Sequence, residues 1–152
     1  KWLAHKPLSV AFKRVPVEFE PDWIVYARSY YVAQQLGQAQ KMVPALFKAI
    51  QEQHEDLTTV DAMANFFAKH GVDRQTFLNN YHGPSTEILL KQGEELSAKF
   101  KIFQVPGFII SGKYKVDPSL SGPDNARLFA TVDYLIKKAE AEQKLNLKSA
   151  AK

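Results

Sequence analysis

The sequence predicts an α/β protein in which a long block of helices interrupts a β-sheet. Residues 8–13 alternate apolar and polar side chains, residues 22–103 follow a helical period, and residues 105–116 return to short extended segments. A single strand or an isolated hairpin is only marginally stable in water, so we expect the first strand and the hairpin to share one sheet. The 152 residues suffice for one such domain.

The N-terminal strand is predicted from Leu8, Val10 and Phe12, which share one face at a period of two. The alternation shifts after Arg14. Pro16 has no amide to donate, so the regular ladder is expected to end or bulge near residue 15.

Five helices are predicted between residues 22 and 103, each bounded by capping or helix-ending residues. Asp22 caps the first helix, which ends at Gly37, and the second carries Val43, Leu46, Phe47 and Ile50, with Pro44 in its first turn. Thr58 or Thr59 caps a third helix, which has Val60, Met63, Ala64 and Phe67 on its apolar face and ends at Gly71. Asp73 caps a fourth helix that ends near Tyr81, and Ser85 caps a fifth that covers Glu87 to Phe103.

A β-hairpin and a last helix complete the predicted elements. Two strands, 105–111 and 113–116, are separated by Ser111-Gly112, a pair typical of a tight turn. Pro118 and Pro123 interrupt the chain, and a final helix then carries Leu128, Val132, Leu135, Ile136 and Ala139 on one face.

Composition excludes several classes of function. The net charge of +4 arises at the two ends, because residues 1–14 carry four bases and no acid while residues 137–152 carry five lysines and two glutamates. No basic face for nucleic acid is therefore predicted in between. No apolar run approaches the roughly 18 residues of a membrane-spanning helix.

The sequence also predicts no bound metal and no cofactor. The four histidines lack metal-ligand spacing, the chain contains no cysteine, and no glycine-rich phosphate loop or Gly-x-Ser-x-Gly motif occurs. Paired acidic residues such as Glu94-Glu95 lie on polar helix faces, which indicates solvated surface more than acid–base chemistry.

Gln104 to Tyr114 form the most specific motif. Pro106 stands at the head of a strand that otherwise has the pattern of a central one, so it fits a strand start or a special turn, including a cis peptide bond. This motif resembles the DsbA family of thiol:disulfide oxidoreductases. Further pieces of the resemblance are Phe12 to Val17, Trp23, Ala27-Arg28 and, near the end, Val132 to Leu135. The resemblance covers essentially the whole chain and depends on the order and spacing of these pieces.

The resemblance implies a thioredoxin-like fold with a helical insertion. Residues 1–20 and 104–152 would form an incomplete thioredoxin-like portion, and residues 21–103 the insertion. The family's Cys-x-x-Cys motif, its preceding strand and its catalytic helix have no counterpart here; Trp2-Leu3 would match the tail of that helix. The missing strand would lie between the strand at 8–15 and the strand at 105–111.

The same resemblance implies the site and its surroundings. Val105 and Pro106, with Gln104, would contact an extended substrate segment, and Lys13 would match a basic residue that supports the active site, although Arg14 is an alternative. Expected partners are unfolded or extended secreted polypeptides with thiols and a membrane redox partner of the DsbB type, in the periplasm.

We expect the sequence to be a piece of a longer oxidoreductase, or to need a second chain that fills the gap. Each buried unpaired backbone group costs about 1–3 kcal/mol against a total stability of about 5–15 kcal/mol, so the remnant is not expected to keep the family geometry alone. Without thiols the 152 residues should be inactive. A cysteine-free peptide-binding module is the main alternative, and an unrelated helical scaffold is the third.

Overall fold

The structure is a computed structural model that describes residues 2–122 and 124–150. It divides into two compact units. The helical unit is formed by residues 14–98, and the hairpin unit combines residues 1–13 with residues 99–152. The interpretation of the helical block as an insertion at 21–103 stays a prediction. Lys1 and Pro123, which the sequence analysis used, lie outside the described residues.

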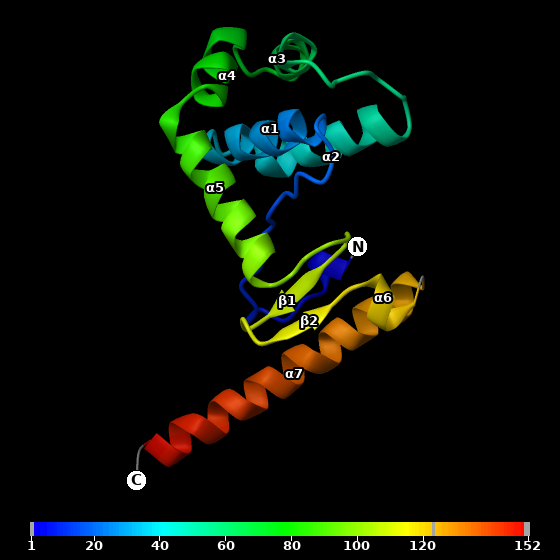
Figure 1. The fold of residues 1–152 in the computed structure, drawn as a ribbon, viewed down its shortest axis with the longest axis vertical. Helices are drawn as coiled ribbons and strands as arrows, with labels where there is room; N and C mark the ends of the chain where they lie inside the picture. Colours follow the sequence, from blue (N-terminus) through cyan, green and yellow to red (C-terminus); the bar gives the residue numbers. More distant parts are fainter. Residues whose placement is uncertain (1, 123, 151–152) are drawn as a thin grey trace. The chain divides into compact units, whose positions relative to one another are not determined.

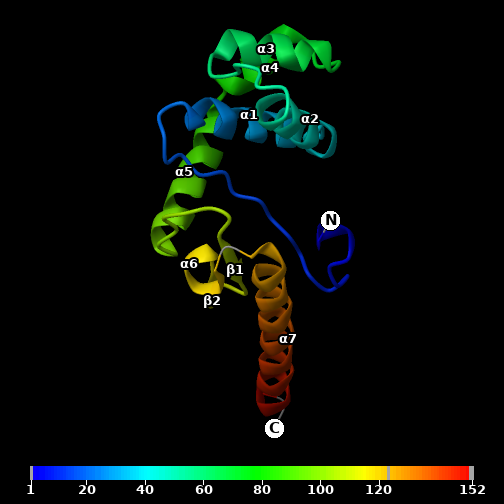
Figure 2. The same cartoon turned by 90° about the vertical axis from the view of Figure 1, so that its right-hand side faces the viewer.

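The helical unit contains α1 (Trp23–Gln35), α2 (Ala39–Gln51), α3 (Val60–Lys69), α4 (Arg74–Tyr81) and most of α5 (Pro84–Lys99). Figures 1 and 2 show α1 beside α2 in one layer, and α3 with α4 in a second layer against them. The apolar faces of four helices therefore meet in one interior.

That interior is made of large, closely packed side chains. Phe67 and Phe77 are fully buried, with ring centroids 4.5 Å apart, and Met42 and Met63 are fully buried as well. The predicted apolar face of the third helix is thus confirmed. Phe47, which the helical pattern also placed inside, is 65% exposed, so that assignment was wrong.

The helix starts follow the predicted capping only in part. The Thr59 hydroxyl accepts from the Ala62 amide at 3.2 Å, and the Asp73 carboxylate accepts from the Thr76 amide at 2.8 Å. Asp22 occupies the N-cap position of α1, but its side chain forms no capping hydrogen bond. Ser85 lies inside α5, because that helix already begins at Pro84, where the absence of an amide proton is harmless.

Two helix limits differ from prediction. The α2 helix begins at Ala39, so Pro44 lies in its interior and not in its first turn; the early start is held by the Gln38 carbonyl, which accepts from the Met42 amide at 2.8 Å. The α5 helix ends at Lys99 and does not reach Phe103. Lys101 adopts a φ of 51°, which breaks the helical path, and Phe103 is 79% exposed, so no burial favours continuing the helix.

The hairpin unit contains a 3₁₀ turn, η1 (Trp2–Ala4), the strands β1 (Phe108–Ile110) and β2 (Tyr114–Val116), the short helix α6 (Pro118–Ser121) and the long helix α7 (Asn125–Ala150). The strands are antiparallel, with Phe108 opposite Val116 and Ile110 opposite Tyr114. Ser111 and Gly112 both have positive φ, and the Lys113 amide donates to the Ile110 carbonyl at 3.0 Å. The predicted tight hairpin is confirmed, with shorter strands.

The hairpin packs on the first half of α7, where both views show it alongside that helix (Figures 1 and 2). A small buried cluster joins them, formed by Ile110, Val116, Leu128, Val132 and Ile136. Trp2 extends the cluster: its ring stacks on Phe129 with centroids 5.8 Å apart, and its Nε1 donates to Asp133 at 2.8 Å. No helix among the described residues is long and apolar enough to cross a membrane.

The predicted strand at residues 8–15 is wrong. The segment has no regular secondary structure, Leu8 is fully exposed, and Val10 is only partly buried against the α7 cluster. Alternation of apolar residues creates a strand only when a neighbouring strand accepts its backbone hydrogen bonds. Within the described residues the sheet holds two strands, β1 and β2, and neither pairs with this segment.

Candidate functional site

The predicted site residues lie in the loop that leads from α5 to β1. Gln104, Val105 and Pro106 form a bend just before the strand, and the Val105–Pro106 peptide bond is cis. Val105 is 48% exposed, and Pro106 is exposed as well. The loop therefore presents an apolar side chain and a rigid ring to solvent beside the start of a strand.

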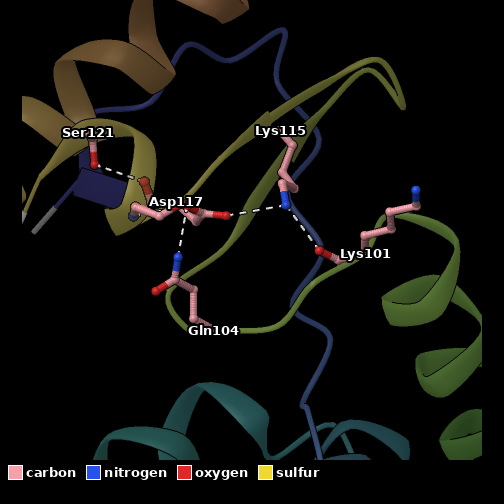
Figure 3. A network of polar contacts seen from close by, with 6 residues as sticks. Lys101, Gln104, Lys115, Asp117 and Ser121 are labelled. Atoms are coloured by element: carbon pink, nitrogen blue, oxygen red, sulfur yellow. Dashed lines mark hydrogen bonds and ion pairs between the residues drawn. The ribbon is translucent and has the colours of Figure 1, made fainter.

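Gln104 is directed differently from its neighbours. It is partly buried, and its Nε2 donates to Oδ1 of Asp117 at 3.1 Å (Figure 3). The side chain of Gln104 thus connects the loop to the end of β2.

Asp117 is the centre of this polar network. It is only 4% exposed, and it caps α6 by accepting from the Ser119 amide at 3.0 Å and from the Ser119 hydroxyl. Its carbonyl accepts from the Ser121 hydroxyl at 3.1 Å. Buried carboxylates are stable only when hydrogen bonds or opposite charges replace the water they lose, and Asp117 has both.

Lys115 gives the network its positive charge. Its Nζ donates to the Lys101 carbonyl at 3.0 Å and lies 3.4 Å from Oδ2 of Asp117 (Figure 3). The loop is therefore attached at two points: at Lys101 by Lys115, and at Gln104 by Asp117.

The network keeps Asp117 ionised. The hydroxyl of Ser119 holds the pKa of the Asp117 carboxyl below its ordinary value, and Lys115 lowers that pKa further, while burial acts in the opposite direction. At neutral pH the loop is thus held by a carboxylate, which accepts stronger hydrogen bonds than a neutral acid.

Lys13 is not among the residues that form the polar network around Asp117. It is exposed within the irregular segment that the sequence predicted as a strand. Its proposed support of an active site stays a prediction, as does the competing choice of Arg14.

Sequence reasoning missed Lys115 and Asp117. Their spacing of two places both on one face at the end of a strand, and Asp117 followed by Pro118 is typical of a helix N-cap. Those signals predict a helix cap. They do not predict the hydrogen bond to Gln104, which lies 13 residues earlier in the chain.

The loop presents the apolar side chains of Val105 and Pro106 to solvent. The chain has no cysteine, so its own residues cannot exchange a disulfide. No group of His, Asp or Glu among the described residues has a metal-binding arrangement. What remains at the loop is an exposed apolar surface on a backbone that buried polar groups hold in place.

Comparison with known proteins identifies the family of this chain. A model of the DSBA-like thioredoxin domain matches residues 2–135. Thiol:disulfide interchange protein DsbA of Burkholderia cepacia is 33% identical over 141 residues, which cover 91% of this chain and 65% of that protein. The Azotobacter vinelandii DsbA is 32% identical over 143 residues, which cover 93% of this chain and 66% of that protein. The chain spans about two thirds of the length of these relatives.

Solved structures show the same similarity. The crystal structure of Pseudomonas aeruginosa DsbA matches 94% of this chain and 74% of its own with a TM-score of 0.86 and 29% identity. A Proteus mirabilis DsbA variant with a non-covalently bound peptide PWATCDS matches 89% of this chain and 75% of its own, with a TM-score of 0.74 and 26% identity.

Proposed function

Because the chain belongs to the DSBA-like thioredoxin domain family, we propose that it is part of a thiol:disulfide interchange protein that oxidises secreted polypeptides in the periplasm. In this proposal the loop at Gln104, Val105 and Pro106 contacts an extended substrate segment. The observation that carries it is the exposed Val105–Pro106 surface beside β1, in a chain similar to a DsbA that holds a peptide non-covalently.

The redox step would need a cysteine pair that the 152 residues do not contain. A substrate thiolate attacks the enzyme disulfide and forms a mixed disulfide, and the second substrate thiol then displaces the enzyme sulfur. The substrate gains one S–S bond and loses two protons and two electrons, while the enzyme disulfide becomes two thiols. A membrane redox partner of the DsbB type would reoxidise the enzyme.

The contribution of this chain is to hold the substrate near that exchange. An extended segment that lies along the loop loses conformational freedom, and a loop that is already ordered adds little further cost. We therefore propose that Val105 and Pro106 contact substrate. The family resemblance adds Lys13, with Arg14 as the alternative, as a residue that supports the active site.

The experiment begins with the complete gene product. Its sequence should contain two closely spaced cysteines on the N-terminal side of Lys1, its thiol count should match them, and it should oxidise a dithiol peptide. The matched control is the same gene product with both cysteines replaced by serine, which should show no oxidation. A gene product with cysteines that leaves the dithiol reduced would overturn the proposal.

The second candidate is a cysteine-free module that binds peptides without redox chemistry. The absence of cysteine together with the exposed loop favours it. A gene product that contains no cysteine and still binds PWATCDS would establish this candidate in place of the enzyme.

A further inference from the structure

The loop from Lys101 to Pro106 has no secondary structure of its own between α5 and β1. Such a segment is ordered only where other groups bind its polar atoms. The structure supplies two such groups. Lys115 binds the backbone carbonyl of Lys101, and Asp117 binds the side-chain amide of Gln104. The second attachment immediately precedes Val105 and Pro106.

These two groups sit on a rigid support. Lys115 belongs to β2, Asp117 caps α6, and Val116 between them is 2% exposed in the α7 cluster. Both side chains point to the same region, where their charged atoms are 3.4 Å apart (Figure 3). The pair thus connects the loop to the buried cluster of the hairpin unit.

The surroundings make this attachment strong. The side chain of Asp117 is 5% exposed and that of Lys115 is 34% exposed, so solvent and salt screen their attraction less than that of a fully exposed pair. No buried side-chain nitrogen or oxygen among the described residues lacks a hydrogen-bond partner. Removing Lys115 takes the ammonium group away from Oδ2 of Asp117 and from the Lys101 carbonyl, and the loop is the part that can move.

We propose that Lys115 and Asp117 are positioning residues, which order the loop for substrate without touching the substrate themselves. This inference rests on the proposed function. According to this inference, residues at the end of β2 contribute to peptide affinity. The sequence motif assigns that affinity to Gln104, Val105 and Pro106 alone.

The hairpin contains its own control. Lys113 lies in the turn just before β2, where its Nζ is 2.6 Å from Oε2 of Glu142 on α7. Lys113 and Lys115 are thus two lysines of one hairpin, each with a carboxylate partner. Only Lys115 binds the loop, so the two substitutions separate loop positioning from general support of the hairpin.

The test measures binding of the peptide PWATCDS to the complete gene product by isothermal titration calorimetry under reducing conditions. Lys115→Met should weaken binding about tenfold, because the loop must then be ordered at the moment of binding. Lys115→Arg should stay within about twofold of the wild type, since a guanidinium can reach both acceptors. Lys113→Met should bind as the wild type does.

Two further measurements distinguish a positioning role from a general loss of structure. In peptide oxidation, Lys115→Met should raise KM and leave kcat nearly unchanged, as expected for loss of an interaction common to ground and transition states. Gln104→Met removes the attachment from the loop side, where the proposed function also places a substrate contact, so it should weaken binding at least as much as Lys115→Met does.

The possible results have distinct meanings. Absence of peptide binding by the wild type would refute the proposed function itself. Wild-type binding that Lys115→Met and Gln104→Met leave intact would refute the positioning role alone. An equal loss in Lys113→Met and Lys115→Met would also refute it, because the hairpin as a whole would then be responsible.

Discussion

The helical unit and the hairpin unit of this chain are stabilised in different ways. In the helical unit, four helices bury large apolar side chains such as Phe67, Phe77 and Met63 in one interior. In the hairpin unit, a two-stranded sheet and one face of α7 bury five apolar side chains, and a buried carboxylate, Asp117, holds the adjoining loop.

The difference follows from how each unit obtains its contacts. Amphipathic helices bury their apolar faces against near neighbours in sequence, so the helical unit needs little from elsewhere. A two-stranded sheet leaves backbone groups on its outer edges and has little apolar area, so polar contacts carry a larger share of its order. Apolar truncations should therefore affect the helical unit most, and polar ones the hairpin unit.

The largest effect is expected for Phe67→Ala. The ring is fully buried and packs on Phe77, so its removal leaves a cavity and should cost about 3–5 kcal/mol. Hydrogen exchange should rise throughout α3 and α4, as followed by mass spectrometry, with little change in β1 and β2.

Phe47→Ala is the matched control, because it removes another phenylalanine ring, which lies on α2 and is 65% exposed. Its effect on unfolding should stay within about 0.5 kcal/mol. If both changes had similar effects, the proposed apolar origin of the helical unit's stability would be wrong.

Asp117→Ala should have the next largest effect, now in the hairpin unit. It removes the cap of α6 and leaves Gln104 and Lys115 without their carboxylate, which should cost about 2 kcal/mol. The midpoint of urea unfolding and the exchange of the 101–107 loop measure this loss.

The pH dependence of the same variant checks the cause. Folding lowers the pKa of Asp117 below the ordinary value of 3.8, so its stabilisation is fully present above that value and is lost as the pH falls through the lowered pKa. The difference between wild type and Asp117→Ala should be constant near neutrality and shrink in strong acid. A difference that persisted in strong acid would show that the charge of Asp117 is not responsible.

A smaller effect is expected for Gly93→Ala in α5. A Cβ at Gly93 would lie 2.7 Å from the hydroxyl oxygen of Tyr31, which is 2% exposed and has little room to move. Crowding should outweigh the roughly 1 kcal/mol gained in helix propensity, for a net loss of about 1 kcal/mol in thermal unfolding.

In the double variant the effect of Gly93→Ala on stability should change from a loss to a gain. In a Tyr31→Phe background the hydroxyl is absent, so Gly93→Ala should stabilise the protein by up to about 1 kcal/mol through helix propensity alone. Equal losses in both backgrounds would exclude the clash with Tyr31 as the cause.

The smallest effect is expected at Glu18. Burial raises the pKa of this carboxyl above 4.5, Glu94 raises it further, and Arg28 lowers it. The native state then binds the proton more tightly than the unfolded chain, so stability decreases as the pH rises from 4.5 through the raised pKa. This is the opposite sign to that of Asp117.

Glu18→Gln should therefore raise stability near neutrality by about a few tenths of a kcal/mol and give no gain near pH 4. Urea unfolding at the two pH values measures it. Glu20→Gln, at a nearby exposed position, is the control and should change neither value. A gain of the same size at both pH values would contradict a charge effect.

Much of the helical unit could be predicted because its signals are local. Thr59 and Asp73 cap helices where the sequence indicated, and Met63, Ala64 and Phe67 form the expected buried face. Phe47 and Phe103 were misplaced for one reason: a periodic pattern shows which residues share a face, but not whether a neighbour covers that face.

The candidate site was predictable in its position and not in its connections. Gln104, Val105 and Pro106 stood out by their motif, whereas Lys115 and Asp117 had no signal beyond a cap and a shared strand face. The segment at 8–15 shows the same limit in reverse, since its residues alternate in the sequence but form no strand, and Leu8 is fully exposed. A strand and a polar network both need partners from distant parts of the chain.

The sequence by itself determined the positions of the long helices, the Ser111-Gly112 turn, the family resemblance and the absence of any thiol for redox chemistry. The helices and the turn depend on neighbours a few positions away, and the resemblance depends on the order of residues along the chain. The tertiary structure alone decided that Gln104 binds a buried carboxylate, that Lys115 holds the Lys101 carbonyl, and that Val105 remains exposed. Those outcomes depend on which groups packing brings within hydrogen-bond distance, and local periodicity carries no information about that.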